Sequence, residues 1–182
     1  MMEEQVILVD KDDNAVGKIG KLEAHQKGLL HRALSIFIFN SKGDILLQQR
    51  ASHKYHTPSL WSNTACSHPR KNELVILAAK RRLKEEMGLE CDLYYAFNFI
   101  YRAKFDNELI ENELDHVFIG FSDEKPKPDP SEVKNYRYIN SDDLMKEINE
   151  KPYIFTPWFK ICIDKVLKVK SIVKKKILIS QN

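Results

Sequence analysis

The sequence predicts an α+β fold in which helices flank a mixed β-sheet. Short apolar stretches such as 33–39 and 117–121 are typical of strands, whereas residues 73–89 (ELVILAAKRRLKEEMGL) switch to a helical period. The 182 residues, 43% of them apolar and 30% charged, are enough for one globular domain with a substantial core. No repeat, low-complexity segment or linker divides the chain, so we expect a single domain over residues 1–182.

The first half of the chain is expected to form two pairs of strands and then a helix. Residues 4–19 contain two short strands around an Asp/Asn turn, and residues 33–51 form a stronger hairpin joined by Asn-Ser-Lys-Gly. The helix at 73–89 ends at Gly88, which stands where a C-cap glycine belongs. The residues before it, 61–73 (WSNTACSHPRKNE), are too polar for a core strand and too irregular for a helix.

The second half returns to strands and ends in two helices. Residues 94–105, 111–122 and 136–139 are expected to be strands, 124–133 a proline-rich surface loop, and 141–152 a helix opened by a Ser/Asp cap. From about residue 160 the chain carries seven lysines against one aspartate. Apolar residues recur among them at helical spacing, so we predict an amphipathic terminal helix with a solvated lysine face. These apolar residues are Ile161, Val166, Leu167, Val169, Ile172 and Val173.

Composition excludes several classes of protein. The N-terminus lacks the features of a signal peptide, and no segment is apolar enough for a membrane span, so we expect a cytoplasmic protein. The three cysteines are odd in number and widely spaced, which argues against a disulfide framework. Cys91 and Cys162 are expected to be small core residues, whereas Cys66 has chemically interesting neighbours. The net charge of +3 is too small to dictate a partner.

Two acidic residues in one predicted strand indicate a cation site. Glu111 and Glu113 are two positions apart, so both carboxylates face one way, and their repulsion calls for solvent, a raised pKa or a cation. Cys66 and His68 likewise share one side of an extended backbone. Taken singly, each histidine is more often a surface or core residue and the acidic pair an exposed edge. Together, five residues could bind zinc or manganese: His25, His31, His68, Glu111 and Glu113.

The end of the predicted helix carries a second acidic feature. Glu85 and Glu86 lie in its last turn, where carboxylates oppose the helix dipole. Arg82 and Glu86 are four apart and share a face, which by itself predicts an ordinary surface ion pair. The acidic pair is more easily understood if it holds a cation.

The region around this helix resembles the Nudix box. Ser67, five residues, Glu73, seven residues and then RRLKEEMGL follow the spacing of that motif. Two positions depart from it: Ser67 replaces a glycine, and Arg82 replaces a glutamate that hydrolytic members use to bind metal. If that glycine serves a positive φ angle, Ser67 is expected to be strained. The resemblance implies a Nudix-like mixed sheet flanked by helices.

Further stretches resemble the type I isopentenyl-diphosphate isomerase family. They are SNTACSHP around Cys66, YRA at 101–103, ENE at 111–113 and TPW at 156–158, and the similarity runs from about residue 5 to about residue 160. The resemblance implies interconversion of isopentenyl and dimethylallyl diphosphate by adding a proton at one end of the allylic unit and removing another across it. Cys66 and Glu113 match the two catalytic positions, and Tyr101 matches the tyrosine that hydrogen-bonds near Glu113. Trp158 matches the aromatic residue over the hydrocarbon pocket, whereas Trp61 is expected only to pack.

The same resemblance implies ligands and partners. His25, His31, His68, Glu111 and Glu113 fall on the family's site for zinc, magnesium or manganese, and Glu86 matches the ligand of a Mg²⁺ that bridges to the substrate. No flavin or nicotinamide is expected. The diphosphate would be held by Lys21, Arg50, Lys54 and Arg82. We expect a small-molecule allylic or homoallylic diphosphate as partner, no nucleic acid, and a monomer or weak dimer.

Two other functions stay open. A Nudix hydrolase of a nucleoside or sugar diphosphate would release phosphate or a nucleotide monophosphate. The presence of Arg82 and Cys66 argues against this function. A non-catalytic module that binds RNA through the lysine tail would leave Cys66, Glu113 and Tyr101 unexplained. Outside the tail, the sequence also lacks the basic stripe and interleaved aromatics of such a binder.

Overall fold

The computed structural model describes residues 4–54, 56–105 and 108–180. In these residues the chain forms strands β1 (Gln5–Val9), β2 (Ala15–Gly20), β3 (His31–Phe39), β4 (Ile45–Arg50), β5 (Trp61–Ser62), β6 (Ala65–Ser67), β7 (Leu93–Lys104), β8 (Ile110–Phe121) and β9 (Val133–Ile139). The helices are α1 (Lys21–Lys27), α2 (Val75–Met87), α3 (Ser141–Glu150) and α4 (Pro157–Ser180), with a 3-10 turn at Pro152–Ile154.

Strand β3 is the centre of the sheet because it pairs along both edges. One edge runs parallel to β8 over its whole length, from His31 opposite Glu113 to Phe39 opposite Phe121. The other edge pairs antiparallel with β1 at His31, with β6 over residues 34–36 and with β4 at Phe39. Outside these, β7 pairs with β8 and β9 with β4. The predicted mixed sheet is therefore confirmed.

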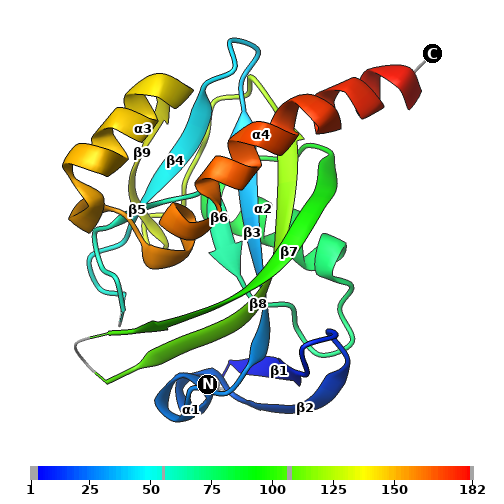
Figure 1. Ribbon diagram of the computed structural model, residues 1–182, viewed down its shortest axis with the longest axis vertical. Coiled ribbons are helices and arrows are strands. Elements are labelled where there is room, and N and C mark those ends of the chain that lie inside the picture. The colour runs from blue at the N-terminus through cyan, green and yellow to red at the C-terminus, as the bar shows by residue number, and fades with distance from the viewer. Residues whose placement is uncertain (1–3, 55, 106–107, 181–182) are drawn as a thin grey trace.

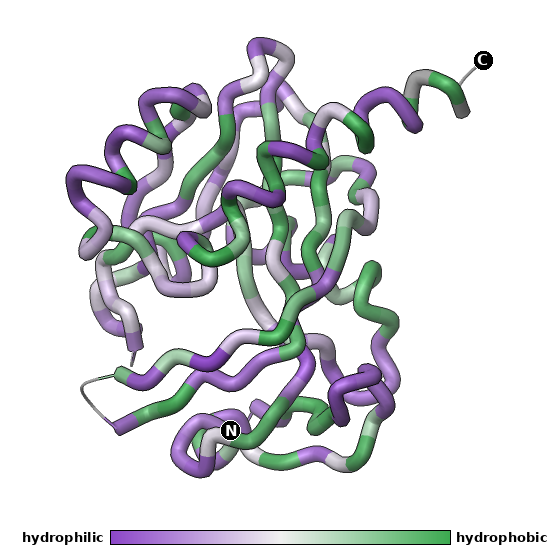
Figure 2. Tube along the Cα trace, in the orientation of Figure 1, coloured by the Kyte–Doolittle hydropathy of each residue, from purple (hydrophilic) through white to green (hydrophobic). Residues whose placement is uncertain are grey.

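Helices cover both faces of the sheet (Figure 1). Because side chains alternate along a strand, Leu34, Ile36 and Ile38 of β3 face one side and Phe37 and Phe39 the other. The first group packs with buried residues of α2, and the second packs with α3 and α4. Figure 2 shows apolar colour concentrated in the central strands and polar colour along the outer helices. Each fully buried Leu or Phe stabilises the folded state by about 1.5–3 kcal/mol relative to an exposed one. These two apolar layers are therefore the core of the protein.

Gly88 ends α2 as the sequence predicts. Its φ of +62° is left-handed, and its N–H bonds to the carbonyl of Lys84. A Cβ atom at this position would lie 2.6 Å from the carbonyl oxygen of Lys127. The N–H of Lys127 in turn donates to the carbonyl of Met87, at 2.8 Å. The end of the helix thus fixes the proline-rich loop, which requires glycine here.

Helix α4 begins at Pro157 and its last turns extend past the edge of the sheet (Figure 1). Val166 and Val173 are buried, as an amphipathic helix requires. Ile161 and Ile172, however, are 54% and 53% exposed, so assigning them to the buried face was wrong. The reason is that α4 crosses the sheet at an angle, and only one narrow stripe of it meets the core. No helix in the described ranges is long and apolar enough to cross a membrane.

The sequence prediction missed three short elements. Helix α1 and strands β5 and β6 have at most seven residues each, too few to show a hydrophobic period. The expected Ser/Asp cap of α3 is wrong, since Asn140 caps it by accepting from the N–H of Asp143. The expected strain at Ser67 is also absent, because this residue lies in β6, paired with Leu34, and its φ is not positive.

Candidate active site

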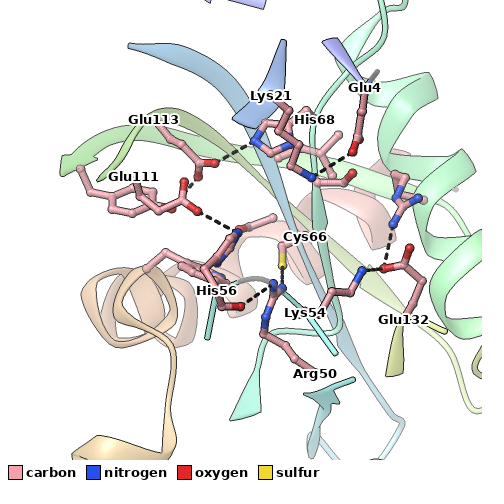
Figure 3. Close-up of a pocket in the computed structure, with 16 residues that line it drawn as sticks. Glu4, Lys21, Arg50, Lys54, His56, Cys66, His68, Glu111, Glu113 and Glu132 are labelled. Atoms are coloured by element: carbon pink, nitrogen blue, oxygen red, sulfur yellow. Dashed lines mark hydrogen bonds and ion pairs between the residues drawn. The ribbon is translucent and has the colours of Figure 1, made fainter. Parts of the chain in front are cut away.

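A pocket opens on the α4 side of the sheet, where β3, β6 and β8 lie next to one another (Figure 3). Ten of the residues expected from the sequence line it: Lys21, Arg50, Lys54, Cys66, His68, Arg82, Tyr101, Glu111, Glu113 and Trp158. His25 and His31 contact two of these residues, whereas Glu86 does not line the pocket. The fold therefore brings these ten residues to one pocket, and their roles stay a prediction.

Strand geometry places the two glutamates side by side. Glu111 and Glu113 lie on the same face of β8, and both are buried. His31 starts β3 directly opposite Glu113, because the two strands pair in parallel register. His25 comes from α1, and His68 follows β6. Four elements, β3, β8, α1 and the residues after β6, thus converge at the central part of the sheet.

The histidines contact the carboxylates at short range. Nε2 of His68 lies 2.9 Å from Oε1 of Glu113, and Nε2 of His31 lies 3.4 Å from the same oxygen. Nε2 of His25 lies 3.2 Å from Oε2 of Glu111. One ligand atom from each of four buried residues lies within 4.8 Å of the others, and these residues are His25, His31, His68 and Glu113.

Burial sets the charge of this cluster. It lowers the pKa of His25 to about 3 and that of His68 to about 4, so both imidazoles are neutral at pH 7. Burial, with the charge of Glu113, raises the pKa of Glu111 well above its usual range. Burial works against the ionisation of Glu113 as well, but hydrogen bonds from His31 and His68 hold its pKa well below that range. Three imidazoles beside a carboxylate suit a divalent ion, so the residues fit a metal site.

Tyr101 is hydrogen-bonded to Glu113. The two residues face each other across the β7–β8 pair, and the tyrosine hydroxyl donates to Oε2 of Glu113 at 2.5 Å. Burial and the neighbouring carboxylates raise the pKa of Tyr101 well above its usual value, so the phenol keeps its proton. Glu113 is thus held from two sides, by histidines on one oxygen and by Tyr101 on the other.

Cys66 lies on β6, opposite Ser35 of β3, and faces the same pocket. Burial raises the pKa of its thiol to about 12, against the opposing charge of Arg50. Nη1 of Arg50 lies 3.7 Å from the sulfur. The thiol therefore retains its proton at neutral pH, unlike a cysteine that is activated as a nucleophile. Cys66, Cys91 and Cys162 are free thiols.

Trp158 closes the apolar side of the pocket. It lies in the first turn of α4, is buried, and its indole N–H donates to Oδ1 of Asn63 at 3.1 Å. The guanidinium carbon of Arg50 lies 5.4 Å from the centre of its ring. Trp61 does not line this pocket but packs against Arg137, in agreement with the expectation that it only packs.

Basic side chains form the rim, and several are paired with carboxylates. Lys21 contacts Glu4 at 3.1 Å, Lys54 contacts Glu132, and Arg82 lies 3.4 Å from the same Glu132. Glu4 and Glu132 were not expected from the sequence. They are ordinary acidic residues in sequence, and only the fold brings them next to the cations.

Glu86 does not belong to the four-residue group formed by the histidines and Glu113. Arg82 donates to its Oε1 from Nε at 3.1 Å and from Nη2 at 2.9 Å, and Gln48 donates to its Oε2 at 2.9 Å. Burial raises the pKa of Glu86, while the charge of Arg82 opposes the rise. Its expected role as the ligand of a separate Mg²⁺ stays a prediction.

Comparison with known proteins identifies the family. The NUDIX domain description matches residues 29–159. A relative from Aromatoleum aromaticum, named isopentenyl-diphosphate Delta-isomerase 1, is 51% identical over 166 residues, covering 91% of this chain and 94% of the relative. The isopentenyl-diphosphate Delta-isomerase of Pectobacterium atrosepticum is 48% identical over 162 residues, covering 89% and 90%. The chain belongs to the isopentenyl-diphosphate Delta-isomerase family of Nudix proteins.

Solved structures agree on the Nudix fold. DR0079 from Deinococcus radiodurans superposes with a TM-score of 0.72 at 16% identity, covering 91% of this chain and 98% of that one. A MutT NUDIX hydrolase from Burkholderia pseudomallei gives 0.59 at 18% identity, covering 75% and 98%.

The Nudix box explains how the loop bearing His68 is held. Glu73 accepts from the backbone N–H of Arg70 at 2.8 Å and from Nε and Nη2 of Arg81 at 2.7 and 2.8 Å. This bidentate ion pair holds the loop against α2. Arg82 follows Arg81 in the chain and stands at the position where hydrolytic Nudix members have a metal-binding glutamate. In this chain Arg82 lines the pocket.

Proposed function

We propose that the protein interconverts isopentenyl diphosphate and dimethylallyl diphosphate in isoprenoid biosynthesis. The observation that carries the proposal is that the thiol of Cys66 and the carboxylate of Glu113 line one pocket, together with Trp158 and a basic rim. The names of the relatives support the same reaction.

The chemistry requires one proton to arrive and another to leave. Protonation of the terminal carbon of the double bond leaves a tertiary carbocation at the internal carbon. Loss of a proton from the neighbouring CH₂ group, on the diphosphate side, then forms the new double bond. Sγ of Cys66 holds a proton, and the ionised Glu113 accepts one. Tyr101 and Glu111 hydrogen-bond to Glu113, so protons can also reach that carboxylate from its neighbours.

Trp158 would stabilise the cation. Its ring lines the pocket in a buried position, where a cation over an aromatic face gains about 1–2 kcal/mol. The same wall would exclude water, which would otherwise add to the cation. A hydrolase would not need an aromatic wall that excludes water, because water is a reactant in hydrolysis.

The diphosphate would be bound by Lys21, Lys54 and Arg82 at the rim and by the buried Arg50 deeper in the pocket. Lys21, Lys54 and Arg82 contact Glu4 or Glu132, and substrate oxygens would exchange for these carboxylates as acceptors. Arg50 lies between the rim and Cys66, so it would join the diphosphate end of the site to the reacting end.

His25, His31, His68, Glu111 and Glu113 would hold a divalent ion, Zn²⁺, Mn²⁺ or Mg²⁺, and Glu86 a Mg²⁺ associated with the diphosphate. When bound, an ion in the histidine cluster supplies positive charge beside Glu113. We expect no flavin, nicotinamide or nucleic acid to take part, and a cytoplasmic monomer or weak dimer.

The test is to incubate the purified protein with isopentenyl diphosphate and Mg²⁺ and to follow dimethylallyl diphosphate and phosphate together. We expect the isomer without release of phosphate. Phosphate release without isomer would favour the Nudix hydrolase, and nucleoside diphosphates would then be the next substrates. Neither product from a metal-loaded protein would contradict the proposal.

A further inference from the structure

His56 is a buried histidine of the pocket that the sequence analysis did not single out. It lies in the connection between β4 and β5 and is 8% exposed. Its Nε2 lies 3.2 Å from Oε1 of Glu111. Figure 3 shows it on the opposite side of Glu111 from Glu113. His25 approaches the second oxygen of Glu111, so the carboxylate lies between two imidazoles.

The ring of His56 is fixed by its neighbours. It stacks on Phe105 with ring centres 5.6 Å apart and meets Trp158 edge-on at 6.2 Å. Its backbone carbonyl accepts from Nη2 of Arg50 at 3.4 Å. One residue thus touches the metal-ligand cluster, the apolar wall and the arginine beside Cys66.

Thr57 holds the outer edge of the same ring. Its hydroxyl lies 3.2 Å from Nδ1 of His56, and its φ of +47° is left-handed. A β-branched residue is strained in that conformation, and such strain is retained where the surrounding structure needs it. Because Thr57 can donate to Nδ1, Nε2 is left to donate to Glu111. Oε1 of Glu111 lies 3.2 Å from this Nε2 and can accept its hydrogen.

We propose that His56 is a positioning residue for Glu111, which it orients toward the metal ligands by a hydrogen bond whose direction Thr57 fixes. The inference rests on the proposed function for its link to turnover. Its effect on the metal site rests only on the geometry. Carboxylates that bind metals are commonly held by such partners, and removing one lowers metal affinity by about 10- to 100-fold.

The experiment uses the metal-stripped full-length protein and Co²⁺ as the probe. We compare wild type, His56→Phe, which keeps an aromatic ring but cannot donate, and His56→Gln, which can donate. His53→Gln is the matched control, since His53 is an exposed histidine of the same connection. Co²⁺ affinity and the visible spectrum of the bound ion are measured first, and kcat and KM for isopentenyl diphosphate second.

We expect His56→Phe to weaken Co²⁺ binding about 10- to 100-fold, to change the spectrum and to lower kcat more than it raises KM. His56→Gln should recover most of the affinity, and His53→Gln should match wild type. Unchanged affinity and spectrum in His56→Phe would overturn the proposal.

Two further points keep the test decisive. If His56→Phe does not fold, as seen by circular dichroism, Thr57→Val serves instead: it keeps the shape of the side chain but loses the hydroxyl. We expect it to weaken Co²⁺ binding, with recovery in Thr57→Ser, and equal binding by both would contradict the role of Thr57. A wild-type protein that binds Co²⁺ but does not isomerise would refute the proposed function without deciding the role of His56.

Discussion

Tyr101 and Glu113 face each other across two neighbouring antiparallel strands, and the tyrosine hydroxyl donates to the carboxylate at 2.5 Å. The register of β7 and β8 therefore sets the distance between the phenol and the carboxylate. A shift of one residue would turn Tyr101 to the other face of the sheet. The pairing of these long strands thus determines part of the chemistry of the pocket.

Tyr101→Phe should lower kcat and leave the fold intact. The variant removes one hydrogen bond to an ionised carboxylate, which is worth about 1.5–3 kcal/mol, or roughly 10- to 100-fold in rate. Steady-state kinetics with isopentenyl diphosphate would measure it, with the thermal midpoint as the check on folding. A variant with wild-type kcat would show that this bond does not support catalysis.

Cys66→Ala and Glu113→Gln should each abolish isomerisation. Each removes a group that holds or accepts a proton in the pocket, while the strands that carry these residues stay paired. Formation of dimethylallyl diphosphate is measured, and circular dichroism confirms the fold. Activity near wild type in either variant would contradict the assigned sites.

Arg82→Gln should weaken binding of the diphosphate. It removes one cation from the rim, and we expect kcat/KM to fall by roughly 10- to 100-fold, mainly through KM. Arg82→Glu is a harsher test, because it would add a carboxylate beside Glu85, Glu86 and Glu132. Lys84→Gln is the matched control, since Lys84 is an exposed cation of the same helix and does not line the pocket. An unchanged KM in both Arg82 variants would remove Arg82 from the substrate site.

Glu73→Gln should destabilise the fold at pH 7 but not at low pH. Hydrogen bonds from Arg81 hold the pKa of Glu73 below its ordinary 4.5, so its contribution is complete above that pH and is lost as pH falls through the lowered value. We expect a loss of about 1–2 kcal/mol in the free energy of unfolding at pH 7. Urea denaturation at pH 7 and at pH 3 would measure it. A difference of equal size at both values would contradict an ionised Glu73.

Removing bound metal with a chelator should lower the thermal midpoint, and adding Zn²⁺ or Mn²⁺ should restore it. An ion that binds only the folded state stabilises it by about 2.7 kcal/mol at 100 times its Kd. Differential scanning calorimetry would measure the shift. His68→Asn provides the comparison, since its midpoint should respond much less to added metal. An equal response in both proteins would place the ion elsewhere.

Much of the fold was accessible from the sequence because its signals are local. The nearly continuous apolar run of β3 and the helical period of α2 determine these elements, and Gly88 marks the end of α2 by its backbone freedom. The short elements were not predicted from the sequence, because a strand such as β6 forms by pairing with β3 rather than through the propensity of its own residues. The buried face of α4 was only partly predicted, since its angle across the sheet is set by tertiary packing.

By itself, the sequence determined the family and the α+β fold, and it predicted which residues form the candidate site. These features depend on the types of residue and on their spacing along the chain, and both are properties of the sequence itself. Only the tertiary structure decided the partners of those residues: His56 beside Glu111, Glu132 beside Lys54 and Arg82, and Gln48 beside Glu86. Contacts between residues far apart in sequence depend on the register of strands and the angle of helices. Burial then sets the pKa values, because desolvation acts only once the pocket has formed.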